Sequence, residues 1–373
     1  MTLRTVTAPI QAGCLNLTLR QEEWPLNECL TYATRQNPRR LYLFVSKVLG
    51  KHWPVRPSVM REVHQRLAAK IADLPGPLLV IGMAETATAL GRGVAEEAAL
   101  QNGRDDVLYL QTTRCRLTRP LAFAFDESHS HAPDHAVYLP EPALQPLFQA
   151  ARSLVLVDDE ISTGRTLAEL ARAYLQVNPQ VEQIALVSIA CWLNPARQRE
   201  LAALLERPVQ FPALIEGEFS FTADPAFPPP ALPDAFADSG RYHDAIATDP
   251  ARIGTVAGDW RLPECSFPLQ RSSGGLTVIG TGEYAYTPFR VALALEEEGY
   301  DVLYQSTTRS PILVGDAIAI RWEFTDHQGD GIPNYLYNLD PDRLPVVIYE
   351  HPALSQAHVL PNMLGGLALA VEE

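Results

Sequence analysis

The stretch of sequence that decides the fold runs from Leu154 to Leu167 and reads LVLVDDEISTGRTL. Its apolar start is typical of a buried strand, which tolerates no charge along its length. Three acids follow directly, and then comes a turn of small and hydroxylic residues that opens a helical pattern. A strand that ends in this way is expected to hold a polar ligand at its tip.

Short apolar runs of this kind recur in the first half of the chain, and helical patterns separate them. The predicted strands are residues 78–82, 106–111, 153–157 and 183–189, and the predicted helices begin near Thr86 and Arg165. Continuous apolar strands separated by helices indicate a mostly parallel sheet covered on both faces. We therefore predict a Rossmann-like α/β fold, in which ligands bind beyond the carboxyl ends of the strands.

The composition narrows the class of protein. The chain has 373 residues, 47% of them hydrophobic, and a formal net charge of -14, which suits an ordinary globular protein of two domains. This acidic balance argues against general binding to nucleic acid or anionic membranes, because such binding rests on clustered Lys and Arg. No apolar run is long enough to span a bilayer, and the 5 scattered cysteines fit a reducing compartment. We expect a cytoplasmic protein without a nucleic-acid or membrane partner.

A Pro- and Ala-rich seam divides the sequence. We predict a first domain over residues 1–220, a Pro-rich connection over 221–273 and a second, smaller α/β domain over 274–373. The two domains echo each other, because LLVIGMAETATALG and DVLYLQTTRCRL are answered in order by LTVIGTGEYAYTPF and DVLYQSTTRSPIL. The second domain is therefore predicted to repeat a strand-helix-strand unit, although it lacks an acidic pair like that at Asp158.

The turn after the acids suits a phosphate. Residues 162–166 offer hydroxyls and backbone N–H groups at the start of a helix, where an anion is favoured. Asp158 and Asp159, just before the turn, can accept hydrogen bonds from two vicinal hydroxyls. Together these features suit a ribose 5-phosphate. A simple helix N-cap is the alternative, but it explains only one or two such residues.

The motif VLVDDEISTGRT resembles the phosphoribosyl-pyrophosphate signature of type I phosphoribosyltransferases. The resemblance implies that Asp158 and Asp159 bind the ribose hydroxyls and Mg²⁺. It also implies that the turn cradles the 5-phosphate through Ser162, Thr163, Gly164, Arg165 and Thr166. The chain departs from the family at Glu160, where an apolar residue is usual. This carboxylate faces solvent, shapes the base pocket or biases metal binding, and the sequence leaves these alternatives open.

The resemblance extends to the ends of two earlier strands. In the family a short loop holds pyrophosphate through backbone N–H groups, and the implied contacts here are Ala84, Glu85 and Thr86. The next strand end reads TTRCRLTR, where Thr113 and Arg114 are the implied pyrophosphate contacts. An arginine suits a phosphate through charge-assisted, forked hydrogen bonds. A solvated basic loop is the alternative for this stretch.

Two further segments resemble parts of the family. Residues 123–139 stand where type I enzymes carry a mobile loop, and His129, His131 and His135 would shield or protonate the reacting centre there. A metal site and a plain polar loop are the alternatives. A non-catalytic, regulatory protein that binds phosphoribosyl pyrophosphate is the alternative to an enzyme, and the absence of the family's loop lysine is an argument for it. Residues 37–57 resemble the hood that recognises the base, with Lys51 and His52, beside Glu160, as implied base contacts; a solvated amphipathic helix is the alternative.

The C-terminal part resembles the TRSP domain, which follows a phosphoribosyltransferase domain in proteins of bacterial tellurite-resistance-type gene clusters. The resemblance is carried by TTRSP at residues 307–311, by the stretch from Asp326 to Asn334 and by YEHPALSQAH. It implies a site at Glu283, Thr308, Arg309 and Ser310 without naming a ligand. A duplicated domain that only buttresses the first is the alternative.

These resemblances imply a Mg²⁺-dependent phosphoribosyltransferase that acts as a homodimer. It would join phosphoribosyl pyrophosphate to a nucleobase-like acceptor, giving a nucleotide and pyrophosphate, or run in reverse. Catalysis would rest on positioning, charge stabilisation and loop closure, with Asp158, Asp159 and Arg114 at the reacting centre. A dinucleotide-binding enzyme is disfavoured, because GMAETATALG lacks the middle glycine of that fingerprint.

Overall fold

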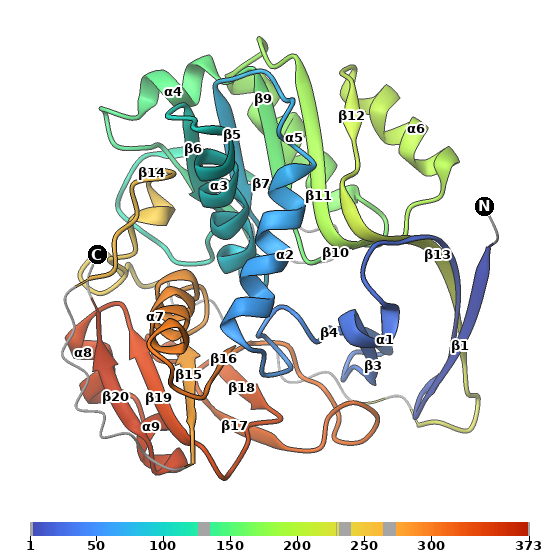
Figure 1. The fold of residues 1–373 in the computed structure, drawn as a ribbon, viewed down its shortest axis with the longest axis vertical. Coiled ribbons are helices and arrows are strands. Elements are labelled where there is room, and N and C mark those ends of the chain that lie inside the picture. Colours follow the sequence, from blue (N-terminus) through green and yellow to red (C-terminus); the bar gives the residue numbers. More distant parts are fainter. Residues whose placement is uncertain (1–2, 126–134, 229, 231–239, 264–273, 372–373) are drawn as a thin grey trace. The chain divides into compact units, whose positions relative to one another are not determined.

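The structure is a computed structural model that describes residues 3–125, 135–228, 230, 240–263 and 274–371 (Figure 1). It forms two compact units, which we name after one acid in each. The Asp158 unit comprises Arg61–Glu216 and Tyr242–Arg261, and the Glu350 unit comprises Met1–Met60, Gly217–Arg241 and Leu262–Glu372. The units interleave along the chain, whereas the sequence predicted consecutive domains with boundaries at 220 and 273.

The Asp158 unit is built on a mostly parallel sheet, as predicted. The strand order is β13-β11-β9-β5-β6-β14, in which only β14 runs antiparallel to its neighbour. The strands are β5 (Leu78–Gly82), β6 (Val107–Gln111), β9 (Ser153–Val157), β11 (Gln183–Cys191), β13 (Ala213–Ala223) and β14 (Thr255–Val256). Every residue of β5, β6 and β9 is buried, which explains their unbroken apolar sequences. The two-residue strands β10 (Glu160–Ile161) and β12 (Val209–Gln210) pair with β11.

Helices connect these strands. They are α3 (Thr88–Asn102), α4 (Gln145–Ala150), α5 (Arg165–Val177) and α6 (Pro195–Leu205), and α2 (Pro57–Ala69) enters the unit at Arg61. Helix α5 buries the stripe expected of an amphipathic helix, including Leu167, Leu170 and Tyr174. Helix α3 packs on β5 so closely that a Cβ on Gly91 would lie 2.6 Å from the Gly82 Cα. The predicted helices at residues 86–100 and 165–176 are thus confirmed within about two residues at each end.

The strand order determines where the connections that follow two neighbouring strands run in opposite directions. Strand β6 lies on one side of β5 and β9 on the other, so the chain leaves the two neighbours β5 and β9 in opposite directions. In open parallel sheets a crevice forms at the carboxyl ends of two such strands, and ligands bind there. The loop after β5 and the acids after β9 therefore lie side by side, which is the arrangement that the sequence predicted.

The segment expected to be a connection is partly integrated into this unit. Residues 242–261 contain the short helix η1 (Pro250–Arg252) and β14, which extends the sheet beyond β6. The backbone N–H of His243 donates to the carbonyl of Arg116, and the Asp244 carboxylate accepts from the N–H of Thr118 at 3.0 Å. These contacts cover the end of β6, so this part of the segment is more than a linker.

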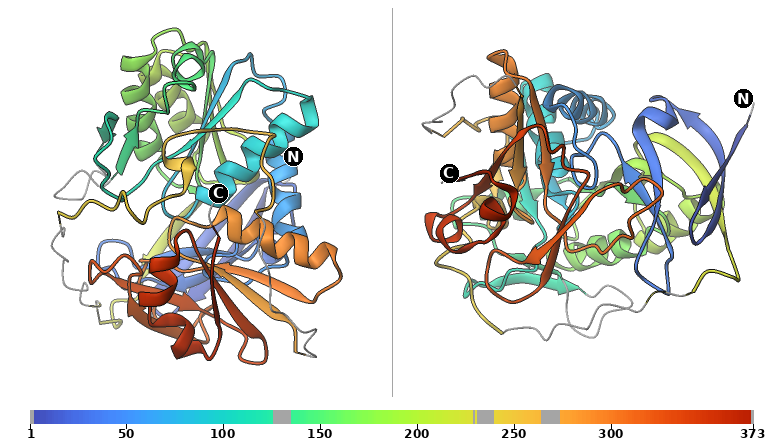
Figure 2. Two further views of the ribbon diagram at one scale, coloured as in Figure 1. Left: turned by 90° about the vertical axis from the view of Figure 1, so that its left-hand side faces the viewer. Right: turned by 90° about the horizontal axis from the view of Figure 1, so that it is seen from below.

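The Glu350 unit contains a second parallel sheet, with the order β16-β15-β19-β20. Its strands are β15 (Leu276–Gly280), β16 (Val302–Ser306), β19 (Leu344–Tyr349) and β20 (Leu367–Ala370), and its helices are α7 (Tyr286–Glu297), α8 (Pro352–Ala357) and α9 (Leu360–Leu364). Helix α7 connects β15 to β16 and packs on both strands (Figure 2). The first strand again lies between the second and the third, so this sheet has a switch point of its own between β15 and β19.

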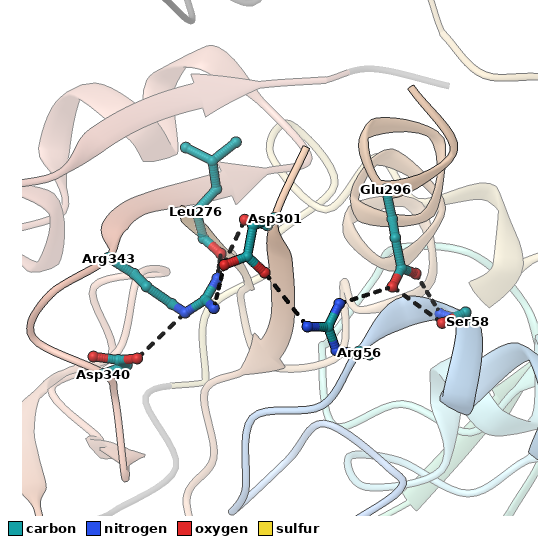
Figure 3. A network of polar contacts seen from close by, with 7 residues as sticks. All are labelled: Arg56, Ser58, Leu276, Glu296, Asp301, Asp340 and Arg343. Atoms are coloured by element: carbon teal, nitrogen blue, oxygen red, sulfur yellow. Dashed lines mark hydrogen bonds and ion pairs between the residues drawn. The ribbon is translucent and has the colours of Figure 1, made fainter. Parts of the chain in front are cut away.

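A polar network fixes the amino ends of this second sheet (Figure 3). The Arg343 guanidinium bonds the Asp301 carboxylate at 2.7 Å, and Asp301 also lies 3.7 Å from the Arg56 guanidinium. Arg56 reaches Glu296 of α7 at 3.8 Å, and the backbone N–H of Ser58 donates to the same carboxylate at 2.7 Å. Single exposed ion pairs stabilise little, but this connected set joins the starts of three strands to α7.

The remaining strands of the Glu350 unit form hairpins. They are β1 (Arg4–Ile10) with β2 (Gly13–Glu22), β3 (Leu30–Thr34) with β4 (Tyr42–Ser46), and β17 (Arg321–Thr325) with β18 (Pro333–Tyr337); the short helix α1 (Leu26–Cys29) precedes β3. One buried cluster joins the last two hairpins through residues such as Val45, Ile312 and Tyr335. Within the described residues, no helix is long and apolar enough to cross a membrane.

Candidate functional site

The acids after β9 lie at the switch point of the first sheet. The backbone N–H of Asp158 still bonds the β11 carbonyl of Val187 at 3.0 Å, so Asp158 stays aligned with the sheet. The next N–H, of Asp159, donates to the Asp158 carboxylate at 2.9 Å. Both side chains are partly buried. The strand therefore delivers two adjacent carboxylates to one edge, as the sequence predicted.

This edge is electrostatically unfavourable for carboxylates. Burial raises the pKa of Asp158 well above its usual range, and the charges of Asp159 and Glu160 raise it further. A ligand that donates hydrogen bonds, or a cation, would relieve the repulsion among these acids. The site is therefore suited to hydroxyl groups and to a divalent metal ion.

The turn between the acids and α5 contains the residues that were predicted to bind a 5-phosphate. Gly164 adopts a left-handed backbone with φ 67°, and a Cβ there would lie 2.6 Å from the Leu201 side chain, so glycine is required. Helix α5 begins at the next residue, Arg165. Arg165 and Thr163 are exposed, and the Arg197 side chain donates to the Thr163 carbonyl at 3.2 Å, which holds the turn from behind. Ser162 and Thr166, the other two residues predicted here, are partly exposed in the same turn.

The loop after β5 is held by hydrogen bonds to its two neighbouring strands. The N–H of Met83 donates to the Val157 carbonyl at 2.9 Å, and the N–H of Ala84 donates to the Thr112 hydroxyl at 2.8 Å. Ala84 and Glu85 are joined by a cis peptide bond. Glu85 and Thr86 remain partly exposed.

The end of β6 adds an arginine and a buried histidine. The His135 ring lies 3.2 Å from the Thr112 hydroxyl through Nδ1 and 3.4 Å from the exposed Arg114 guanidinium through Nε2. Arginine only donates, so Nε2 accepts and Nδ1–H donates to Thr112. The N–H and carbonyl of Thr113 both bond Ala136, and the His135 ring stacks on Phe125 with centroids 5.3 Å apart. One chain of contacts thus connects the loop after β5 to Arg114.

The structure revises the expected place of the histidines. His135 does not stand in a loop but begins β8 (His135–Tyr138), which pairs with β7 (Leu121–Phe125), and it is buried. Its ring contacts Thr112 and Arg114, and its predicted role in shielding or protonating the reacting centre stays a prediction. The sequence contained one signal of this strand, since Val137 and Tyr138 are residue types favoured in strands. His129 and His131 lie outside the described residues.

The hood residues make their described contacts in the Glu350 unit. Lys51 is buried, and its ammonium donates to the Gly282 carbonyl in the loop after β15 at 3.0 Å. The His52 carbonyl accepts from the Asn338 side chain at 3.2 Å. The segment is not the amphipathic helix that was the alternative, because residues 47–54 contain no helix. The predicted role of both residues as base contacts, with Glu160 of β10, stays a prediction.

The implied TRSP-domain residues gather at the carboxyl ends of the second sheet. Thr308 bonds Tyr335 through its N–H and carbonyl, and its hydroxyl accepts from the N–H of Ser310 at 3.1 Å. Glu283 follows β15 and is buried, while Arg309 follows β16 and is partly exposed. In the nearby 326–334 stretch, the Asp326 carboxylate caps its own loop. Glu350, a buried acid directly after β19, lies in the YEHPALSQAH stretch but was not among the implied site residues.

The Asp158 site can hold a magnesium ion only together with a ligand. Among the described residues, no group of three or more His, Cys, Asp or Glu side chains is arranged to bind a metal. Mg²⁺ commonly uses one or two carboxylates and completes its shell with water and substrate phosphates. Asp158 and Asp159 fit that smaller donor set.

Two family models match the chain. A phosphoribosyl transferase family model matches residues 29–218, and a model of the TRSP domain, described as C-terminal to that transferase, matches residues 261–364. No curated protein matches the chain.

Three solved structures illustrate the similarity. Giardia lamblia APRTase with 9-deazaadenine has 16% identity and a TM-score of 0.29, covering 43% of this chain and 80% of its own. Trypanosoma brucei adenine phosphoribosyl transferase with AMP, pyrophosphate and ribose-5-phosphate has 12% identity and a TM-score of 0.36. The match covers 57% of this chain and 86% of that one. Mycobacterium tuberculosis orotate phosphoribosyltransferase with Fe(III) dicitrate has 12% identity and a TM-score of 0.30. The match covers 51% of this chain and 90% of that one. At these TM-scores the matches add nothing to the assignment, which rests on the family models. The chain belongs to the phosphoribosyl transferase family and carries a C-terminal TRSP domain.

Proposed function

We propose that the chain transfers a phosphoribosyl group from phosphoribosyl pyrophosphate to a ring nitrogen of a nucleobase-like acceptor, or catalyses the reverse reaction. The observation that carries the proposal is the meeting of three elements at one switch point. The adjacent acids follow β9, an anion-binding turn opens α5, and a loop pinned between β6 and β9 follows β5. Family membership supports the reaction class, and this geometry supports the proposed place of each part of the substrate.

Each element suits one part of the substrate. Asp158 and Asp159 accept hydrogen bonds from the two ribose hydroxyls. The turn at residues 162–166 holds the 5-phosphate with hydroxyls, backbone N–H groups and the start of α5. The backbone at Ala84 to Thr86, with Thr113 and Arg114, holds the pyrophosphate, on which negative charge accumulates as the bond to the sugar breaks.

Mg²⁺, held by Asp158 and Asp159 with the substrate, would neutralise part of the pyrophosphate charge. The protein's own contribution is to fix the groups before the substrate arrives. His135 aligns Arg114, and Thr112 holds the loop after β5 in place. No covalent nucleophile is required, so positioning and charge stabilisation supply the rate enhancement. A homodimer in the cytoplasm belongs to the same proposal.

The first test is calorimetric titration of the full chain with phosphoribosyl pyrophosphate and Mg²⁺. We expect saturable binding that is lost in the Asp158→Asn, Asp159→Asn double variant. Glu182→Gln serves as the matched control, since this exposed acid precedes β11 at the amino end of the sheet, where it pairs with Arg152. No binding to a folded wild type would refute the proposal.

A screen of bases for pyrophosphate release is the next experiment. Release with one base identifies the acceptor. Binding without release under single-turnover conditions, with every base tried, would instead support a regulatory protein that binds phosphoribosyl pyrophosphate without chemistry.

A further inference from the structure

The second sheet repeats the first one in atomic detail at its carboxyl ends. Gly82 pairs with Val157 across β5 and β9, and Gly280 pairs with Ile348 across β15 and β19. In both sheets the threonine after the second strand holds the loop after the first. The Thr112 hydroxyl accepts from Ala84 at 2.8 Å, and the Thr307 hydroxyl accepts from Gly282 at 2.8 Å.

The repeat continues through the neighbouring hairpin. Thr308 bridges to Tyr335 of β18 as Thr113 bridges to Ala136 of β8. The Tyr337 hydroxyl accepts from the N–H of Ile312 and donates to the carbonyl of Ser310, and the Tyr138 hydroxyl forms the same pair of bonds. The Tyr138 hydroxyl accepts from the N–H of Leu117 and donates to the carbonyl of Cys115. The Glu350 unit therefore contains a second copy of the framework that forms the Asp158 site.

The two copies differ in the residues directly after the third strand. By the paired strands, Tyr349 and Glu350 stand in the places of Asp158 and Asp159. The Tyr349 hydroxyl bonds the His358 ring at 2.6 Å, so this position is neutral and already engaged. The next residues lead into the six-residue helix α8, and no Ser-Thr-Gly-Arg-Thr turn is present. The second copy thus keeps one carboxylate and lacks a cradle for a 5-phosphate.

The charges around the second switch point also differ. The three strand ends of the first copy carry Arg114 against four acids, namely Glu85, Asp158, Asp159 and Glu160. The second copy carries Arg309 against Glu283 and Glu350 at its strand ends, with the buried Lys51 and Asp326 close by. The strand ends of the second copy thus carry fewer acids than those of the first, which makes them less repulsive to an anionic group.

We propose that the Glu350 unit holds a second ligand site for a sugar monophosphate, at the carboxyl ends of β15, β16 and β19. Arg309, Lys51 and the backbone after Gly282 bind the phosphate, as the corresponding loop and Arg114 would bind pyrophosphate in the first copy. Glu350 accepts hydrogen bonds from sugar hydroxyls.

The 326–332 loop borders this site. A Cβ on Gly282 would lie 3.3 Å from the His327 ring, so His327 stands beside the phosphate-binding backbone. The Asp326 carboxylate accepts from the N–H groups of Asp330 at 3.0 Å and Ile332 at 2.6 Å, which gives the loop a fixed shape. This ordered loop forms one wall of the site and keeps His327 in place.

The test is calorimetric titration of the full chain with ribose 1-phosphate, a sugar phosphate that lacks a 5-phosphate. The buffer contains EDTA, so that no free metal ion is present. We expect one equivalent per chain to bind, more tightly than inorganic phosphate. Arg309→Gln should weaken this binding at least about tenfold, and Arg114→Gln, the matched change in the first copy, should leave it unchanged. Glu350→Gln should reduce the affinity for ribose 1-phosphate to that for inorganic phosphate.

Other outcomes would overturn the proposal. The proposal fails if ribose 1-phosphate does not bind, or if it binds no more tightly than inorganic phosphate. It also fails if Arg114→Gln, and not Arg309→Gln, weakens the binding of ribose 1-phosphate. Thermal unfolding of each variant shows whether it is folded, and Arg309→Lys provides a milder change if Arg309→Gln is not. Because metal and phosphoribosyl pyrophosphate are absent, the result does not depend on whether the first site is a transferase.

Discussion

The Thr112→Val variant removes one hydroxyl at the end of β6 and keeps the number of side-chain heavy atoms. In the wild type this fully buried hydroxyl accepts from the N–H of Ala84 at 2.8 Å and lies 3.2 Å from His135 Nδ1. Valine leaves the Ala84 N–H without its acceptor, at a cost of about 1–3 kcal/mol, and loses the histidine contact, at about 1 kcal/mol. The free energy of unfolding should fall by about 2–4 kcal/mol, which lowers Tm by roughly 4–16 °C.

The same change should weaken ligand binding, because the loop after β5 then loses its fixed position. We expect the Kd for phosphoribosyl pyrophosphate with Mg²⁺ to rise about tenfold, equivalent to about 1.4 kcal/mol. Thr112→Ser should restore both properties, since it keeps the hydroxyl. Calorimetric titration and thermal unfolding of the same samples measure the two effects.

The internal repeat provides the matched control. Thr307→Val removes the equivalent hydroxyl, which accepts from the N–H of Gly282, and should cost about 1–3 kcal/mol of stability. It should leave the affinity for phosphoribosyl pyrophosphate unchanged. Unchanged affinity in Thr112→Val, or an equal loss in Thr307→Val, would refute the assignment of the loop after β5 to this ligand.

Three further predictions concern the Asp158 unit. Because folding raises the pKa of Asp158, the stability that its protonation contributes is complete below the unfolded pKa and is lost as pH rises through the folded pKa. In EDTA near neutral pH, Asp158→Asn should therefore have a Tm that is a few degrees higher than that of the wild type. This difference should vanish in acid, where Asp158 of the wild type is protonated. His135→Gln should raise the Kd for phosphoribosyl pyrophosphate by roughly tenfold through Arg114, an assignment that an unchanged Kd in titration would exclude. Gly91→Ala should destabilise the unit by about 1–3 kcal/mol in denaturant titration, since its Cβ would lie 2.6 Å from the Gly82 Cα, and a neutral result would mean that α3 can move away from β5.

Local patterns in the sequence predicted most of the first sheet. The runs at Leu78–Gly82 and Ser153–Val157 were expected with the bounds that the structure has, because a fully buried strand needs uninterrupted apolar residues. The acids and the turn of the candidate site come directly after one of these strands in the chain, so their position was also visible. The sequence could therefore show the features that lie within about fifteen residues of a strand end.

Contacts between distant residues could not be predicted in this way. Lys51 and Gly282 are separated by 231 positions, and no periodicity connects them. The repeated Thr-Thr-Arg is visible in the sequence, but only the structure shows that Thr112, rather than its neighbour, holds the loop after β5. Glu350 lies in the YEHPALSQAH stretch, but only the pairing of β15 with β19 shows that it stands beside the loop after β15.

The polar residues at the second switch point argue against a sheet that only buttresses the first. Glu350 and Lys51 are 1% and 2% exposed, and removing a charged group from water costs several kcal/mol unless it is compensated. Apolar residues of similar size would stabilise a purely structural sheet end at least as well. The framework hydrogen bonds of Thr307 and Thr308 keep their counterparts from the first copy, while the groups that would face a ligand differ. A duplicated fold that keeps its framework hydrogen bonds but changes the polar groups at its strand ends is better explained by a second ligand than by support alone.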